Sequence, residues 1–116
     1  MQEAFAVEPM AKPDLTGALD SLWAKFLPEL QERVALLERA NAALAAGTLS
    51  VELRAKANAA AHKLAGVLGT FGLTKGTVLA QEAEIIYSGE PDTDPADEIH
   101  LQQIAAELRV VLATRK

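Results

Sequence analysis

The sequence predicts an all-α protein folded as an antiparallel up-and-down four-helix bundle with an N-terminal helical lead-in. Of its 116 residues, 50% are apolar and 23 are alanine, whereas only 4% are aromatic. That balance favours closely packed helices over a sheet. Apolar residues recur at spacings of three and four, and no stretch alternates as a half-buried strand does. Short connections between the long amphipathic segments favour antiparallel neighbours.

The first long helix is predicted to begin at an N-cap, either Asp14 or Thr16, and to end at Gly47. Pro28 interrupts its apolar stripe, so we expect a kink there or the start of a second helix. Residues 1–13 contain two prolines and are expected to form a flexible lead-in.

Three further helices follow in the prediction, and the bundle domain would therefore span residues 14–116. Ser50 can cap a helix over 51 to about 70, and a helix from about Thr74 to Ser88 comes next. The stretch SGEPDTDP is a loop. Asp94 then has the features of an N-cap, with Pro95 at the first helical position, and the basic C-terminal pair suits the dipole of this last helix.

Composition excludes several classes of function. The net charge of −5 argues against a general nucleic-acid binder. The chain has no cysteine, so it has no disulfide framework or thiol chemistry, which fits a reducing compartment. Its N-terminus lacks a signal-peptide pattern, and its longest apolar run is too short to span a bilayer. We expect a soluble cytoplasmic domain that does not bind membranes.

Charge is unevenly distributed along the chain. Residues 51–75 carry four basic side chains against Glu52 alone, a balance of +3 that leaves −8 for the remainder. The four are Arg54, Lys56, Lys63 and Lys75. Such a basic island suits an acidic or anionic partner, although chance scatter of surface charges is the alternative.

His62 is predicted to point away from the core. On a helical wheel with about 100° per residue and Leu53 at zero, an apolar stripe is centred near 10°, and His62 falls near 180°. The stripe consists of Leu53, Ala57, Ala60, Leu64, Leu68 and Phe71.

Small residues surround His62 where a solvent-facing helix would normally carry long polar ones. We expect these positions to form a docking surface that gives access to the imidazole; they are Ala55, Asn58, Ala59, Ala65, Gly66 and Gly69. A glycine at position 66 destabilises a helix interior by roughly 1 kcal/mol relative to alanine, which suggests that a side chain there would obstruct something. The alternative is that Gly66 and Gly69 let another helix of this protein cross closely.

The stretch AHKLAGVLGTFGL resembles the signature of histidine-containing phosphotransfer (HPt) domains. His62, Leu64, Gly66 and Gly72 match the histidine, the leucine two residues on and two glycines of that signature. The resemblance covers about residues 14–113 through the order of the helices and the segment LWAKFLPELQERVALLE.

Two positions depart from the family pattern. Ala65 stands where the family commonly has lysine or arginine, and Val67 where it often has a small polar residue. Lys63, about 100° round the helix from His62, is the available charge that could lie near a phosphoryl group.

The resemblance implies that His62 is the phosphoacceptor, through its Nε2 nitrogen, in exchange with an aspartate of a response-regulator receiver domain. An imidazole with its ordinary pKa of about 6.5 is largely neutral at pH 7, so a ring nitrogen is available as nucleophile. The partners implied are such receivers or a hybrid histidine kinase. This chain shows no metal-ligand cluster, so no cofactor is expected here and Mg²⁺ would belong to the receiver. We expect a monomer without autokinase activity.

Other candidate sites have simpler interpretations. His100, in the first turn of the last helix, is expected to be a solvated polar residue, and Glu82 and Glu84 to be solvated as well. The pair Trp23 and Phe26 is expected to contribute to packing of the core or of the lead-in. Two alternatives to a phosphocarrier stay open: an HPt-like adaptor that binds a receiver or kinase without carrying phosphate, and a plain helical scaffold.

Overall fold

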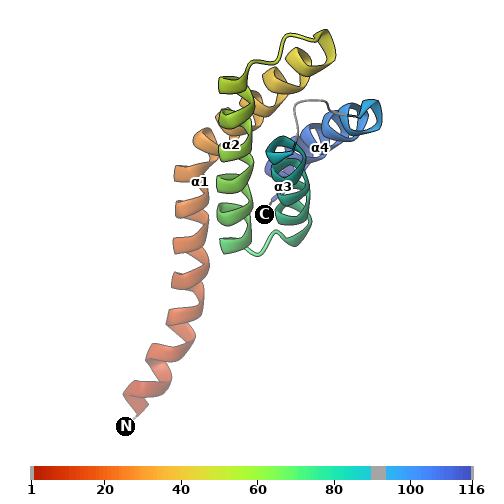
Figure 1. Ribbon diagram of the computed structural model, residues 1–116. Coiled ribbons are helices and arrows are strands. Elements are labelled where there is room, and N and C mark those ends of the chain that lie inside the picture. Colours follow the sequence, from red (N-terminus) through yellow and green to blue (C-terminus); the bar gives the residue numbers. More distant parts are fainter. Residues whose placement is uncertain (1, 90–93, 116) are drawn as a thin grey trace.

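The computed structural model describes residues 2–89 and 94–115, and the side chains of residues 17–89 and 94–115. In chain order the helices are α1 (Gln2–Ala46), α2 (Val51–Thr70), α3 (Thr74–Ser88) and α4 (Pro95–Thr114). The described residues contain no strand. Helices α1 and α3 each pack against both α2 and α4, so α2 and α4 occupy opposite corners of the bundle (Figure 1). The predicted all-α four-helix bundle is confirmed.

Helix α1 is longer than the sequence predicted. It begins at Gln2, not at Asp14 or Thr16, and continues past the ends of the other helices toward the N-terminus (Figure 1). Pro28 is exposed and lies inside this helix, where it removes one backbone donor without dividing the helix in two. The division of the chain into a flexible lead-in and a bundle domain at residue 13 stays a prediction.

The predicted helix ends are set by local capping. The Ser50 hydroxyl accepts a hydrogen bond from the backbone N–H of Leu53 at 3.0 Å, and the Asp94 carboxylate accepts one from Ala96 at 3.0 Å. Gly47 and Gly72 have φ values of +74° and +72°, the left-handed conformation that commonly follows a helix. Residues 90–93 of the predicted loop lie outside the described residues.

Aliphatic side chains and alanines fill the core, and one buried polar network crosses it. The Tyr87 hydroxyl of α3 donates to the Asn41 side-chain oxygen of α1, whose amide donates to the Leu101 carbonyl of α4 at 3.0 Å. Burial raises the pKa of Tyr87 to about 12. Because each buried polar group here has a partner, the network ties three helices together without an unsatisfied donor.

An aromatic cluster lies at the end of the bundle opposite to this polar network. The Trp23 ring lies 5.1 Å from the Phe71 ring, edge to face, which confirms that Trp23 packs in the core. The Arg115 guanidinium lies 5.2 Å from the Trp23 ring and 5.4 Å from the Phe71 ring, and it donates to Asp20 at 3.0 Å. Arg115 is the C-cap residue of α4 and binds these groups, and its predicted interaction with the dipole of the helix stays a prediction.

A close approach between helices occurs at Gly76, a glycine that no sequence motif marks. A Cβ atom on Gly76 of α3 would lie 2.9 Å from Leu68 Cδ1 and 3.2 Å from Val111 Cγ1. Gly76 therefore lets α3 sit close to both α2 and α4.

Candidate functional site

Helix α2 buries the predicted apolar stripe and exposes His62. Ala57, Ala60, Leu64 and Leu68 are buried, and the stripe ends, Leu53 and Phe71, are half-buried against the core. The His62 side chain is 73% exposed. The helical-wheel prediction for this histidine is therefore confirmed.

The His62 ring is oriented by a carboxylate from α3. Its Nδ1 atom lies 2.8 Å from Oε2 of Glu84, whose side chain is 30% exposed. A carboxylate can only accept, so Nδ1 carries the hydrogen of this bond. The neutral ring then has its lone pair on Nε2, the nitrogen on the opposite side, which is available for chemistry. The prediction that Glu84 is merely solvated is wrong.

Asn58 fixes the helix that supplies this carboxylate. Its side-chain amide donates to the backbone carbonyl of Glu84 at 2.8 Å. Glu84 is thus held at its backbone by Asn58 and bonded through its side chain to His62. Asn58 is half-buried, so it contributes to positioning more than to an open docking surface.

The two glycines after His62 differ in their surroundings. A Cβ atom on Gly66 would meet nothing within 4 Å, so no part of the described protein needs that space. A Cβ on Gly69 would lie 3.5 Å from the Thr77 hydroxyl of α3, an ordinary contact distance. Gly66 therefore leaves the surface beside His62 open, whereas Gly69 adjoins α3.

Ala65 does not belong to the accessible surface. It is 8% exposed and part of the core cluster, because α3 packs on this side of α2 and the Thr77 hydroxyl donates to the Ala65 carbonyl at 3.4 Å. The prediction that Ala65 forms part of the docking surface is therefore wrong, because the buried face of α2 is wider than its leucine stripe. Ala55 and Ala59 are exposed as predicted.

The basic island is only partly available to a partner. Lys63 is exposed beside His62. Lys75 pairs with Glu107 of α4 at 3.1 Å, and an Arg54 nitrogen donates to the Tyr87 carbonyl at 3.4 Å. Internal partners thus engage two of the four basic side chains.

The second histidine also has a glutamate partner. Nε2 of His100 in α4 lies 2.6 Å from Oε1 of Glu82, and the two side chains are 43% and 41% exposed. The prediction that His100 and Glu82 are simply solvated is wrong, because the pair joins α3 to α4.

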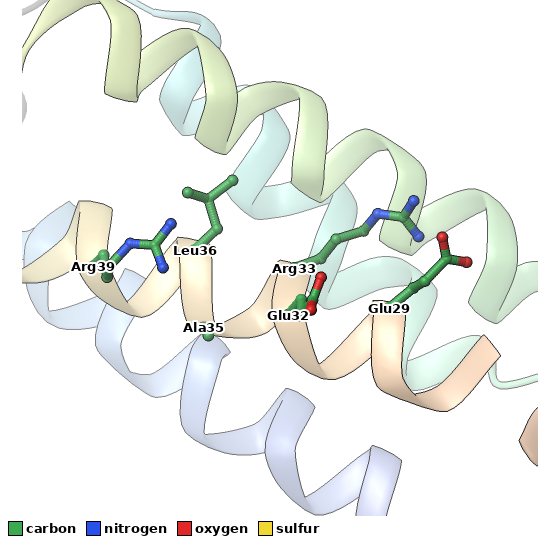
Figure 2. A pocket seen from close by; sticks show the side chains of 6 residues that line it. All are labelled: Glu29, Glu32, Arg33, Ala35, Leu36 and Arg39. Carbon is green, nitrogen blue, oxygen red and sulfur yellow. The ribbon is translucent and has the colours of Figure 1, made fainter. Parts of the chain in front are cut away.

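Other features of the described residues supply no competing site. No group of three His, Cys, Asp or Glu residues within the described part of the chain could hold a metal ion. Among the same residues, no helix is long and apolar enough to cross a membrane. A hollow of 420 Å³ on α1 is lined by Glu29, Glu32, Arg33, Ala35, Leu36 and Arg39 (Figure 2). The side chains of Glu29, Arg33 and Leu36 extend from α1 toward α2 there.

Sequence reasoning missed Glu84, although one signal was present. His62 and Glu84 are equally distant along the chain from Leu73, which lies between the two antiparallel helices. Mirror positions of a helical hairpin lie at the same height in the bundle. The orientation of Glu84 toward α2 was the part that required the structure.

Comparison with known proteins gives the family. Protein RcaC of Microchaete diplosiphon is 31% identical over 77 residues, a match that covers 66% of this chain and 12% of that protein. No solved structure gives a significant match. The family model of the Hpt domain matches residues 21–114, which include all of α2 and α3. The chain therefore belongs to the Hpt domain family, the phosphotransfer modules of two-component signalling.

Proposed function

We propose that this domain is a histidine phosphocarrier that exchanges a phosphoryl group with the aspartate of receiver domains, and that His62 is the phosphoacceptor. One observation carries the proposal: His62 is 73% exposed, its Nδ1 is bonded to Glu84, and Gly66, one turn further along α2, leaves open space on the surface. Family membership supports the class of reaction, since Hpt domains work with receiver domains and histidine kinases.

In the proposed transfer step, no proton leaves the imidazole ring. The Nε2 lone pair attacks the phosphorus of the aspartyl phosphate, an N–P bond forms, and the P–O bond to the aspartate breaks with its electron pair returning to the carboxylate. The phosphorylated ring retains its Nδ1 hydrogen and becomes a cation. The Glu84 carboxylate at 2.8 Å stabilises that charge, and the reverse attack regenerates the neutral ring.

The chain's own contribution is then positioning and charge. A rigid helix presents the nucleophile, Glu84 selects the nitrogen, and Gly66 leaves room for the donor. Lys63 is the exposed cation of α2 nearest in sequence to the ring, and we assign it a role beside the phosphoryl group. In this proposal the domain needs no cofactor of its own, and Mg²⁺ belongs to the receiver.

A second candidate function follows from Ala65. A core alanine stands where the family commonly has a cation, so the domain would bind a receiver or kinase without holding phosphate. This adaptor has the same fold and docking surface as the phosphocarrier but no phosphohistidine.

One experiment separates the two functions. The protein is mixed with receiver domains carrying radioactive phosphate on aspartate, and the label is tested for lability in acid and stability in alkali. Such label on His62, absent from His62→Gln, supports the phosphocarrier. Two results together support the adaptor. The receiver binds without transferring label, and phosphoramidate, a small phosphoryl donor, also fails to label the protein.

A further inference from the structure

The outward face of α4 is uncharged and carries two exposed aliphatic side chains. A helical wheel with about 100° per residue places Ile99 and Val110 within about 40° of Ala106, and the buried Leu108 on the opposite side. Ile99 is 59% exposed and Val110 is 58% exposed. The other exposed residues on this face are also uncharged; they are Gln102, Gln103, Ala106 and Ala113.

The charged residues that border this face are neutralised within the chain. Residues 99–114 contain one acidic residue, Glu107, and one strongly basic residue, Arg109. Glu107 pairs with Lys75 of α3 at 3.1 Å. Arg109 donates to both oxygens of Glu38 in α1, at 2.7 and 3.0 Å. Each carboxylate at the border is therefore matched by a permanent cation.

The outward face of α3 differs in the charges at its borders. Ile85 is 69% exposed there. Glu84 on one border is bonded to His62, and the partner of Glu82 on the other border is His100 as well as no lysine or arginine that the described contacts show. Histidine is not a permanent cation. Two copies that met through α3 would bring four carboxylates together, whereas two copies that met through α4 would not.

A hollow adjoins the uncharged face of α4 on the side toward α1. Its volume is 320 Å³, and it is lined by Glu38, Asn41, Ala42, Gln102, Ala105 and Ala106. Two of these residues, Gln102 and Ala106, belong to the uncharged face itself. A partner that docks on α4 can therefore bury an aliphatic side chain beside it.

We propose that two copies of this chain form a symmetric homodimer through the outward faces of their α4 helices, with Ile99, Ala106 and Val110 at the contact. The chain has a net charge of −5, so two copies repel each other unless they meet through an uncharged surface. A two-fold axis places the same face on both copies, and this face offers both aliphatic side chains and a hollow to receive them. A partner of opposite charge would gain more from an acidic surface.

The proposed dimer leaves the histidine of α2 accessible and does not depend on whether it carries phosphate. Helices α2 and α4 occupy opposite corners of the bundle, so His62 lies on the outer side of each copy (Figure 1). The dimer replaces the monomer expected from the sequence, in which the pairing of Glu107 and Arg109 with other helices could not be seen.

Sedimentation velocity of the full chain tests the dimer. A contact between two helices buries less surface than the roughly 1,600 Å² of a standard interface, so we expect a reversible dimer. Its sedimentation coefficient should rise from the monomer to the dimer value between about 1 μM and about 1 mM protein. Ala106→Glu and Val110→Glu should each raise the dissociation constant at least about tenfold, since the two-fold axis brings two unpaired carboxylates into the contact.

Matched variants add the same charge elsewhere. Ile85→Glu changes α3 and Leu22→Glu changes α1, at side chains that are 69% and 44% exposed. Both should dimerise as the wild type does. Circular dichroism and thermal melting verify that all four variants fold.

Cysteine cross-linking locates the contact independently. The chain has no cysteine, so a single substitution reports on one position. Ala106→Cys should give a disulfide-linked dimer under mild oxidation, because a disulfide requires Cα atoms within about 7 Å of each other. Ala55→Cys, at an exposed position of α2, is the matched variant and should cross-link at least about tenfold more slowly.

A chain that stays monomeric up to about 1 mM would overturn the dimer. A dimer that is unchanged in Ala106→Glu and Val110→Glu, or that Ile85→Glu or Leu22→Glu weakens equally, would overturn the α4 contact. We expect the α4 variants to take label from phosphoramidate as the wild type does. A wild-type chain that dimerises but takes no label would contradict the phosphocarrier and support the dimer.

Discussion

The molecule contains two histidine–glutamate pairs, and α3 supplies the glutamate of each. Glu84 reaches across to His62 of α2, and Glu82, two residues earlier, reaches across to His100 of α4. The bond lengths are similar, 2.8 and 2.6 Å. The pairs differ in which ring nitrogen is bonded, because Glu84 binds Nδ1 of His62 whereas Glu82 binds Nε2 of His100.

In the proposed function, that difference separates the phosphoacceptor ring from a structural one. With Nδ1 bonded, the lone pair of His62 lies on Nε2, the ring nitrogen farther from the backbone. With Nε2 bonded, His100 has only Nδ1 left, the nitrogen closer to its own helix. Exposure follows the same order, 73% for His62 and 43% for His100.

The residues one turn further along each helix reinforce the contrast. Four residues after His62 comes Gly66, beside which there is open space. Four residues after His100 comes Ile104, which is buried in the core. We therefore expect that a bound glutamate alone does not make a phosphoacceptor, and that a free ring nitrogen and open space on the surface are needed as well.

The largest expected effect is the loss of labelling in His62→Gln. We expect no phosphoryl acceptance from a receiver or from phosphoramidate, with helicity and melting temperature nearly unchanged, because the ring is mostly solvent-exposed. His100→Gln is the matched variant and should retain wild-type labelling. Label that persists in His62→Gln, or that disappears in His100→Gln, would contradict the assignment of His62 as the phosphoacceptor and of His100 as a structural residue.

Loss of the glutamate should have a smaller effect. Glu84→Ala removes both the orientation of the ring and the charge that stabilises its cation, so we expect transfer to slow by about 10- to 100-fold. Glu84→Gln retains an acceptor oxygen for Nδ1 and should lose less. Nitrogen NMR of His62 provides a structural readout, since Glu84→Ala should mix the two ring tautomers.

Glu82→Ala is the control for this prediction. It breaks the other pair and should leave both the transfer rate and the His62 tautomer as they are in the wild type. If Glu84→Ala transfers at the wild-type rate with an unchanged tautomer, the carboxylate is not what positions His62.

Sequence reasoning predicted the features that local signals determine. Ser50, Asp94 and Gly47 mark helix ends through their own side chains or backbone conformation, so these boundaries could be predicted. His62 was placed correctly because its own helix carries a strong leucine stripe. The start of α1 was wrong, because capping residues and prolines near position 14 did not interrupt a helix that begins at Gln2.

Features that depend on where a second helix lies could not be predicted in the same way. Alanine is compatible with either a core or a surface position, and only the approach of α3 decides that Ala65 is buried. Glu82 and Glu84 look alike in the sequence, yet they bind different histidines because they lie on different sides of α3. Gly76 was likewise missed, since its importance comes from the close Leu68 and Val111 side chains.

The smallest expected effects concern the clearance beside each histidine. Gly66→Ala should stabilise the protein by up to about 1 kcal/mol, since alanine is the better helix former and its Cβ meets nothing. Gly66→Leu should keep the fold but slow transfer from a receiver several-fold, because its side chain would fill the open surface one turn from His62. Gln103→Leu, an exposed position beside His100, is the matched variant and should leave transfer unchanged.

Gly76→Ala tests whether open space, and not glycine as such, distinguishes the surface at Gly66. Its Cβ would be forced against Leu68 and Val111, and overpacking of this kind typically destabilises by about 1–3 kcal/mol, more than the gain in helix propensity. Thermal melting should therefore shift in opposite directions for the two alanine variants. If Gly66→Ala instead lowers the melting temperature while its folded fraction transfers normally, Gly66 serves helix packing, and the clearance beside His62 has no role in docking.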